Sequence, residues 1–132
     1  MAHDGDLIEI WGDGEQTRSF MYIDDCIEGL VRLMSSSYRA PINLGTDHLI
    51  SINGLVDLVS DIAGKRLVKK HDTTKPQGVR GRNSDNNRLR EVLNWEPSIP
   101  LNEGLRTTYL WIESELQRTG RIQHARITQT AA

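Results

Sequence analysis

The segments of this chain that can form β-strands are few and short, and this limits its possible folds more than any other feature. Residues 7–11 (LIEIW) alternate apolar and polar side chains, as a half-buried strand does. Residues 19–23 (SFMYI) can form a second strand or an extended entry to a helix, residues 41–45 (PINLG) a short apolar strand, and residues 66–71 (RLVKKH) a short edge strand. Such strands cannot make a complete sheet. We therefore expect a small α+β arrangement that is part of a larger structure.

Four segments repeat apolar residues at the spacing of amphipathic helices. Short polar side chains accept hydrogen bonds from the free N–H groups of a first helical turn, and glycine readily takes the left-handed conformation that ends a helix. Residues 72–83 are predicted as a loop and residues 118–132 as a disordered tail. The sequence predicts helices from Asp24 (as N-cap) to about Met34, from Ser51 (as N-cap) to Gly64, from Ser84 (as N-cap) to Val92 or Leu93, and from Leu101 to about Leu116.

The composition of the 132 residues argues against several classes of protein. A net charge of -2 and an isoelectric point near 6.1 do not suit a general nucleic-acid-binding surface. The single cysteine rules out an internal disulfide and a cysteine-based zinc site, and the four histidines lack metal-ligand spacing. The apolar runs fall far short of the roughly 20 residues of a membrane-spanning helix, and residues 1–7 do not resemble a secretory signal. We therefore expect a soluble, cytoplasmic chain without a metal site.

Common catalytic and cofactor-binding motifs are missing from the sequence. It contains no G-x-G-x-x-G, no H-E-x-x-H, no C-x-x-C and no G-x-S-x-G. Tyrosine is never followed by lysine four residues later, so there is no Tyr-x-x-x-Lys pair. No residue of this chain is therefore predicted to be catalytic or to bind a cofactor.

Three arginines on glycine-flanked segments are the candidate ligand-binding residues. Arg18 follows the GDG turn of residues 12–14, and Arg80 and Arg82 lie in GVRGRNSDN, just before a predicted helix start. A guanidinium is a planar, permanently charged fork that binds phosphate oxygens through two hydrogen bonds, and a helix N-terminus also favours anions. Two such segments that face one cleft would bind a diphosphate.

Simpler interpretations stay open for these residues and their neighbours. The arginines can equally be solvated or pair with an aspartate at position 24, 25 or 85. Gln16 and Thr17 can hydrogen-bond a ligand or complete a hairpin, and the sequence alone favours the hairpin. Cys26 lies on an apolar helical stripe, which predicts a buried side chain and not a nucleophile. The tryptophans are predicted to be packing residues and not stacking platforms: Trp11, Trp95 and Trp111.

Several of these motifs, taken in order, resemble a known family. WGDGEQTRSFMYIDDCIEGLVRL, then PINLG, GVRGRNSDN and LNWEP with the later GLRTTYLWI resemble the C-terminal part of the extended short-chain dehydrogenase/reductases that act on nucleotide sugars. QTRSF together with RGRNSDN is most similar to the GDP-mannose 3,5-epimerases of that family. The resemblance covers roughly residues 8–116. It implies that residues 1–117 form the C-terminal nucleotide-sugar-binding lobe, without the Rossmann domain.

The resemblance also implies roles for individual residues. In the family the Gln-Thr-Arg segment binds the nucleotide sugar, which here is Gln16, Thr17 and Arg18, and the second Arg of Arg-Gly-Arg contacts the diphosphate, which here is Arg82. The role of Arg80 is left open. NAD is bound by the N-terminal Rossmann domain, which carries the glycine-rich turn and Tyr-x-x-x-Lys, and full-length members are homodimers. The acid–base cysteine of the GDP-mannose enzymes lies upstream, so Cys26 is not its counterpart.

Two hypotheses about function follow. In the first, the chain is the GDP-mannose-type binding lobe of an NAD-dependent epimerase, an isomerase that is inactive in this form because the catalytic half is missing. Such a fragment would come from a truncated gene, a partial sequence or a split protein, and its partners would be the nucleotide sugar and the missing Rossmann domain. In the second, the chain is a non-catalytic binding or interaction module of the same fold, or a lobe of another nucleotide-sugar epimerase or dehydratase. Neither hypothesis involves nucleic acid or a membrane.

Overall fold

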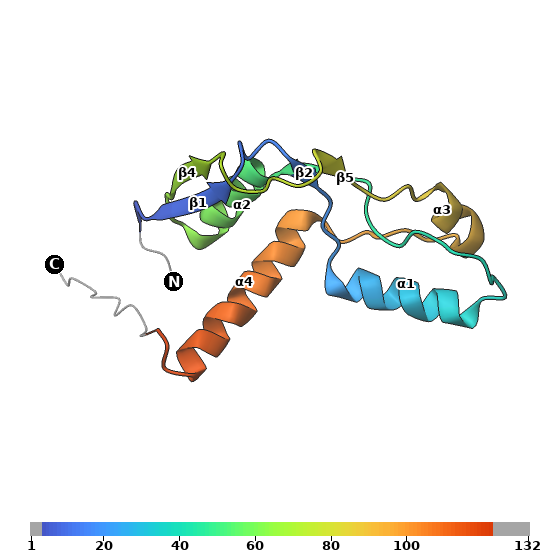
Figure 1. The fold of residues 1–132 in the computed structure, drawn as a ribbon. Helices are drawn as coiled ribbons and strands as arrows, with labels where there is room; N and C mark the ends of the chain where they lie inside the picture. Colours follow the sequence, from blue (N-terminus) through green and yellow to red (C-terminus); the bar gives the residue numbers. More distant parts are fainter. Residues whose placement is uncertain (1–3, 123–132) are drawn as a thin grey trace.

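The computed structural model describes residues 4–122 and has the α+β architecture that the sequence predicts (Figure 1). Figure 1 shows β1, β4 and α2 together at one end, α1 and α3 at the other, and α4 running obliquely from the middle. The elements in chain order are β1 (Leu7–Trp11), β2 (Thr17–Arg18), α1 (Ile23–Ser35), β3 (Ile50–Ser51), α2 (Ile52–Ala63), β4 (Val68–Asp72), β5 (Gly81–Arg82), α3 (Asn87–Leu93) and α4 (Leu101–Arg118).

The strands form two small sheets. In the first, β1 pairs in parallel with β4, from Leu7 opposite Val68 to Trp11 opposite Asp72. Parallel neighbours need a crossover connection, and α2 lies in the chain between them. In the second sheet β2 is central, antiparallel to β3 and parallel to β5. This second sheet carries the residues that the sequence analysis singles out.

The structure decides between the two alternatives for residues 19–23, and it differs from two other predictions. Residues 19–22 form the extended entry to α1, because the ladder of β2 ends at Arg18. The predicted strand at residues 41–45 is not formed, and a strand needs a neighbour to satisfy its N–H and C=O groups. The predicted loop of residues 72–83 ends in a short strand, β5, because β2 lies beside it.

The helix ends confirm some predicted caps and correct others. The Ser51 side chain caps α2 by accepting a hydrogen bond from the Gly54 N–H (3.0 Å), and Gly64 ends α2 in the left-handed conformation, with φ of 62°. The N-cap prediction for Asp24 is wrong. Tyr22 occupies the N-cap position, and Asp24 lies within the first turn of α1.

The predicted cap at Ser84 is also wrong, because α3 begins three residues later at Asn87. Contacts with the segment after α1 hold residues 84–86 outside the helix. The Ser84 N–H donates to the Thr46 carbonyl (3.1 Å), and the Asn86 amide donates to the Gly45 carbonyl (2.9 Å). Tertiary hydrogen bonds therefore override a local sequence signal for a helix start.

Little apolar surface is enclosed, and α1 shows why. Within residues 4–122 the only large apolar side chains that are buried are Ile10 and Leu89. The inward face of α1 carries Asp25 and Gly29, and a Cβ atom on Gly29 would overlap Leu44 and Trp95. Cys26 is half-buried, which is less than predicted. The apolar residues of α1 are exposed instead: Ile23, Ile27, Leu30, Val31 and Met34.

The C-terminal helix α4 extends two residues beyond its predicted end, to Arg118. Of the segment predicted as a disordered tail, residues 123–132 lie outside the described residues. Among the helices of residues 4–122, none is both long and apolar enough to cross a bilayer.

Candidate functional site

The GDG turn between β1 and β2 is the foundation of the candidate site. Gly12 and Gly14 have φ of 84° and 75°, a region that favours glycine. A Cβ atom on either residue would also overlap a neighbouring side chain, Gln77 at Gly12 and Asn53 at Gly14. The Asn53 N–H donates to the Gly14 carbonyl (2.9 Å), and its side-chain amide donates to Glu15 Oε1 (2.7 Å). The turn is therefore fixed against the start of α2.

The Gln16 side chain lies buried beneath this turn and forms hydrogen bonds that stabilise it. Only 6% of the residue is exposed. The Gln16 amide donates to the Trp11 carbonyl (2.9 Å), and its Oε1 accepts a hydrogen bond from Gln77 (3.2 Å). The side chain thus links the turn to the loop before β5.

The pairing of β2 with β5 brings the two predicted arginines together. Thr17 lies opposite Gly81 and Arg18 opposite Arg82. The Thr17 N–H donates to the Arg80 carbonyl (2.8 Å), and the Ser19 N–H donates to the Arg82 carbonyl (3.2 Å). Sequence positions 64 residues apart thus become neighbours on adjacent strands.

The two arginines differ in what their guanidinium groups contact. Arg18 Nη1 donates to the carbonyls of Thr17 (2.6 Å) and Val79 (2.9 Å), so this side chain curls back over the loop before β5. For Arg82, by contrast, residues 4–122 supply no hydrogen-bond acceptor or ion-pair partner to the guanidinium. Arg82 is exposed, which leaves its donors accessible to an anion.

Arg80 pairs with Asp13, which is not among the three aspartates considered from the sequence. Arg80 Nη1 lies 2.7 Å from Asp13 Oδ2 and 3.0 Å from Oδ1. Hydrogen bonding by Arg80, joined by the Glu15 N–H and Gln77, holds the pKa of the Asp13 carboxyl below its usual 3.8. The Arg80 guanidinium is therefore occupied within the chain.

A hollow of about 480 Å³ lies beside Arg82, and we call it the Arg82 hollow. Its volume is within the range of small-molecule sites. Besides Arg82, its polar groups include Asn43 and Asn83, which the sequence analysis did not single out because Asn43 sits inside the apolar run PINLG. The remaining lining comes from Ser19, Met21, Ile42, Leu44, Gly45, Thr46 and Ser84.

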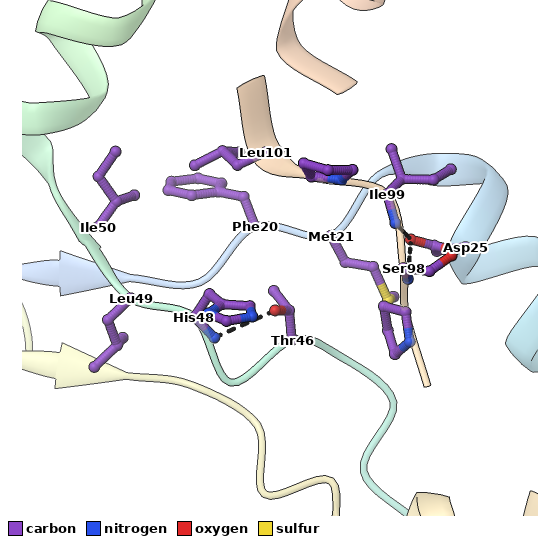
Figure 2. A pocket seen from close by; sticks show the side chains of 12 residues that line it. Phe20, Met21, Asp25, Thr46, His48, Leu49, Ile50, Ser98, Ile99 and Leu101 are labelled. Carbon is purple, nitrogen blue, oxygen red and sulfur yellow. Dashed lines mark hydrogen bonds between the residues drawn. The ribbon is translucent and has the colours of Figure 1, made fainter. Parts of the chain in front are cut away.

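A second, more enclosed cavity of about 350 Å³ adjoins the first, since Met21 and Thr46 line both (Figure 2). Figure 2 shows Phe20 beside Leu101 on the apolar side of this cavity. On the other side, Asp25 Oδ2 accepts hydrogen bonds from the N–H groups of Ser98 (3.0 Å) and Ile99 (2.8 Å). Asp25 is thus a structural anchor at the cavity wall.

Across residues 4–122, no three His, Cys, Asp or Glu side chains gather to hold a metal ion. The predicted packing roles of Trp11 and Trp111 are wrong within this chain, because both are more than half exposed.

Comparison with known proteins places this geometry in a family. A sequence model of the family described as GDP-mannose 4,6 dehydratase matches residues 2–108. The chain is 48% identical over 113 residues to a GDP-mannose 3,5-epimerase of Arabidopsis thaliana, which covers 86% of this chain and 30% of that protein. The chain thus spans less than a third of the length of this relative.

Solved structures agree with the sequence comparison. A Thermotoga maritima UDP-glucose 4-epimerase with UDP-glucose matches with a TM-score of 0.74 and 32% identity, over 83% of this chain and 36% of that one. A Bacillus cereus UDP-glucuronic acid 4-epimerase in complex with UDP-glucuronic acid and NAD matches with the same TM-score and coverage and 30% identity. The chain belongs to the extended short-chain dehydrogenase/reductases, the family of NAD-dependent nucleotide-sugar epimerases and dehydratases.

Proposed function

We propose that this chain is the nucleotide-sugar-binding lobe of an NAD-dependent epimerase that acts on a GDP-mannose-type substrate. The observation that carries the proposal is the 48% identity to a GDP-mannose 3,5-epimerase over 86% of the chain. The pairing of Arg18 with Arg82 on β2 and β5 supports it, because two guanidinium groups on adjacent strands suit the charge of a diphosphate.

In this proposal the site consists of Gln16, Thr17, Arg18 and Arg82. Arg82 contacts the diphosphate directly from the rim of the Arg82 hollow, since its donors are accessible. Arg18 supplies a second positive charge beside it. The Gln16 side chain is buried, so its part is to hold the Gln-Thr-Arg backbone at the rim.

NAD chemistry belongs, in this proposal, to a Rossmann domain outside residues 1–132. When bound there, NAD would take up and return the hydride of the sugar. The sequence supports this assignment, because residues 1–132 contain no G-x-G-x-x-G and no Tyr-x-x-x-Lys. We therefore expect the isolated chain to bind a nucleotide sugar without turning it over.

The test is isothermal titration of GDP-mannose into the full chain, alone and with the N-terminal part of the Arabidopsis relative supplied. Arg82→Ala should weaken binding about 10- to 100-fold, since hydrogen bonds to charged groups contribute roughly 1.5–3 kcal/mol. Arg39→Ala is the matched control, because Arg39 is an exposed arginine whose guanidinium, among the described residues, donates only to the nearby carbonyls of Ser36 and Tyr38. Equal losses in both variants would contradict a specific role for Arg82.

The same titration separates the alternatives. Preference for UDP-glucose over GDP-mannose would make the chain a lobe of another nucleotide-sugar enzyme, as the likeness to the UDP-glucose 4-epimerase allows. Failure to bind any nucleotide sugar, even with the N-terminal part present, would favour a non-catalytic module. Conversion of GDP-mannose by the chain with NAD alone would overturn the proposal that catalysis requires a separate Rossmann domain.

A further inference from the structure

The alignment of Arg18 with Arg82 depends on a ladder that is too short to fix its own register. β2 and β5 pair over only two residues each, so β5, at the edge of the three-stranded sheet, has few ladder hydrogen bonds that fix its register. A slip of one residue would turn the Arg82 side chain to the opposite face of the sheet. Something beyond the ladder must therefore hold the 77–82 segment in place.

The carboxylate of Asp13 accepts hydrogen bonds from the segment before β2 and from the segment before β5. Arg80 Nη1 donates to Asp13 Oδ2 (2.7 Å) and Oδ1 (3.0 Å), and the Gln77 amide donates to Oδ1. On its own side, Asp13 Oδ1 also accepts a hydrogen bond from the Glu15 N–H (2.8 Å). We call Asp13, Gln77 and Arg80 the Asp13 cluster. It joins two segments that are more than 60 residues apart.

Asp13 can act as an anchor because the turn that carries it is itself fixed. The Asn53 amide donates to the Asp13 carbonyl (3.2 Å), and the Gly12 N–H donates to the Asp72 carbonyl (2.8 Å). These bonds tie the turn to α2 and to the end of β4. The Asp13 cluster therefore attaches the 77–82 segment to the turn between β1 and β2. The position of that turn is fixed by α2 and β4 and does not depend on the β2–β5 ladder.

The exposure of the Asp13 and Arg80 side chains determines how much the Asp13 cluster contributes to stability. The Asp13 and Arg80 side chains are 46% and 63% exposed, and exposed ion pairs add little to global stability. Loss of the cluster should thus leave the fold nearly as stable as before. Its effect should instead be local, on the position of β5.

We propose that Asp13 is a positioning residue that sets the β2–β5 register through Gln77 and Arg80, and so aligns Arg82 with Arg18. The consequence for ligand affinity rests on the proposed function. The register itself does not, so the two are tested separately.

The first experiment measures amide hydrogen exchange of the full chain without any ligand. The Thr17 and Ser19 N–H groups, which donate to the carbonyls of Arg80 and Arg82, should exchange at least about 10-fold faster in Asp13→Ala. Asp57→Ala is the matched control, since it removes an exposed carboxylate that pairs with Lys69 at 2.6 Å, outside the Asp13 cluster. Unchanged protection of Thr17 and Ser19 in Asp13→Ala would overturn the proposal.

The second experiment is a double-mutant cycle with GDP-mannose as the probe. If Asp13 acts through Arg82, then Arg82→Ala should weaken binding about 10-fold or more in the wild type but less than about 3-fold in Asp13→Ala. Exchanging the charges, with Asp13→Arg and Arg80→Asp together, should restore part of the affinity. If Asp13→Ala instead caused a general loss of structure, its melting temperature would fall. Arg82→Ala would then weaken binding by the same factor in the wild type and in Asp13→Ala.

The outcomes of the two experiments are distinguishable. If the wild type binds no GDP-mannose, the proposed function fails, and the exchange of Thr17 and Ser19 still decides whether Asp13 sets the register. If the wild type binds and the effects of Asp13→Ala and Arg82→Ala simply add, Asp13 does not position Arg82.

Discussion

Two adjacent aspartates at the start of α1 show how environment separates residues that look alike in the sequence. Asp25 is 5% exposed, and its Oδ2 accepts hydrogen bonds from the N–H groups of Ser98 and Ile99. Asp24 is exposed and lies within the first turn of the helix. The carboxylate that matters for the fold is therefore the one that joins α1 to the segment before α4.

We predict that Asp25→Ala destabilises the chain by about 2–4 kcal/mol, because the buried Asp25 carboxylate accepts two hydrogen bonds from the part-buried N–H groups of Ser98 and Ile99, and both are lost. Asp24→Ala should change the free energy of unfolding by less than about 1 kcal/mol, the usual effect of an acidic residue in a first helical turn. Urea unfolding followed by circular dichroism measures both variants. Similar losses in the two would show that Asp25 is not the anchor.

The charge of Asp13 gives a prediction about pH. Hydrogen bonding by Arg80 lowers the pKa of Asp13 in the folded chain below its usual 3.8. A carboxyl of this kind contributes fully above its unfolded pKa, and the contribution is lost as the pH falls through the folded pKa. Protection of the Thr17 and Ser19 amides should therefore hold from pH 7 down to about pH 4 and fall below that.

The control for this experiment is Asp13→Asn, which has no charge to lose. Hydrogen bonding by Thr74 also lowers the pKa of Asp72, so Asp72 titrates in the same acidic window. Because Asp13→Asn retains Asp72, only the Asp13 part of the pH dependence should disappear in this variant. Persistence of the whole pH dependence would assign it to Asp72 or to other groups.

At the scale of elements, two serines that carry the same sequence signal have different roles. Ser51 accepts a hydrogen bond from the Gly54 N–H at the start of α2. Ser84 precedes α3 by three residues, and its buried hydroxyl has no hydrogen-bond partner among the described residues. We expect Ser51→Ala to cost about 1 kcal/mol of stability.

Ser84→Ala should be neutral or slightly stabilising, because it removes a polar group that has no partner and creates no orphan donor. Thermal unfolding of the two variants side by side is the measurement. A larger loss for Ser84→Ala than for Ser51→Ala would mean that the Ser84 hydroxyl has a partner that the described residues do not show.

The two serines show which features of the fold can be predicted from the sequence and which cannot. Periodicity placed all four helices of the described chain, and local chemistry identified Ser51 and Gly64, because these signals lie within one or two turns. The start of α3 depends on hydrogen bonds to Gly45 and Thr46, and such long-range contacts have no local signature.

Some features of the candidate site could likewise be predicted from the sequence, and others depend on long-range contacts. Arg18 and Arg82 were selected from glycine context and family resemblance, and the structure places them on neighbouring strands. The pairing of Arg80 with Asp13 spans 67 positions, so the sequence offered no reason to prefer Asp13 over the three aspartates that were considered. Asn83 has no distinguishing signal in the sequence, because an amide in a polar loop is ordinary.

At the scale of the whole molecule, the apolar face of α1 is the feature from which we predict behaviour in solution. The helix directs Gly29 and Asp25 inward, while Ile27, Val31 and Met34 are 52%, 53% and 82% exposed. This is the reverse of the usual orientation of an amphipathic surface helix. We expect an exposed apolar helix face of this kind to be a contact surface.

We predict that the isolated chain self-associates through this face. Burial of apolar area contributes about 25 cal/mol per Å², so covering a few hundred Å² contributes several kcal/mol. This gain only slightly exceeds the lower estimates for the free-energy cost of association, which gives weak, concentration-dependent oligomers. Substituting Ile27, Val31 and Met34 together by Gln keeps good helix formers in α1 while removing the apolar face. This variant should raise the dissociation constant at least about 10-fold in sedimentation equilibrium.

The matched control changes the same helix without touching its apolar residues. Glu28→Gln with Arg32→Gln removes an exposed ion pair of 2.6 Å on α1 and should leave the dissociation constant within about 3-fold of the wild type, since such pairs contribute little. Circular dichroism of all three proteins establishes that α1 remains helical. A wild-type chain that sediments as a monomer at every concentration, with a sharp melt independent of concentration, would show that the apolar face of α1 does not drive association of this chain.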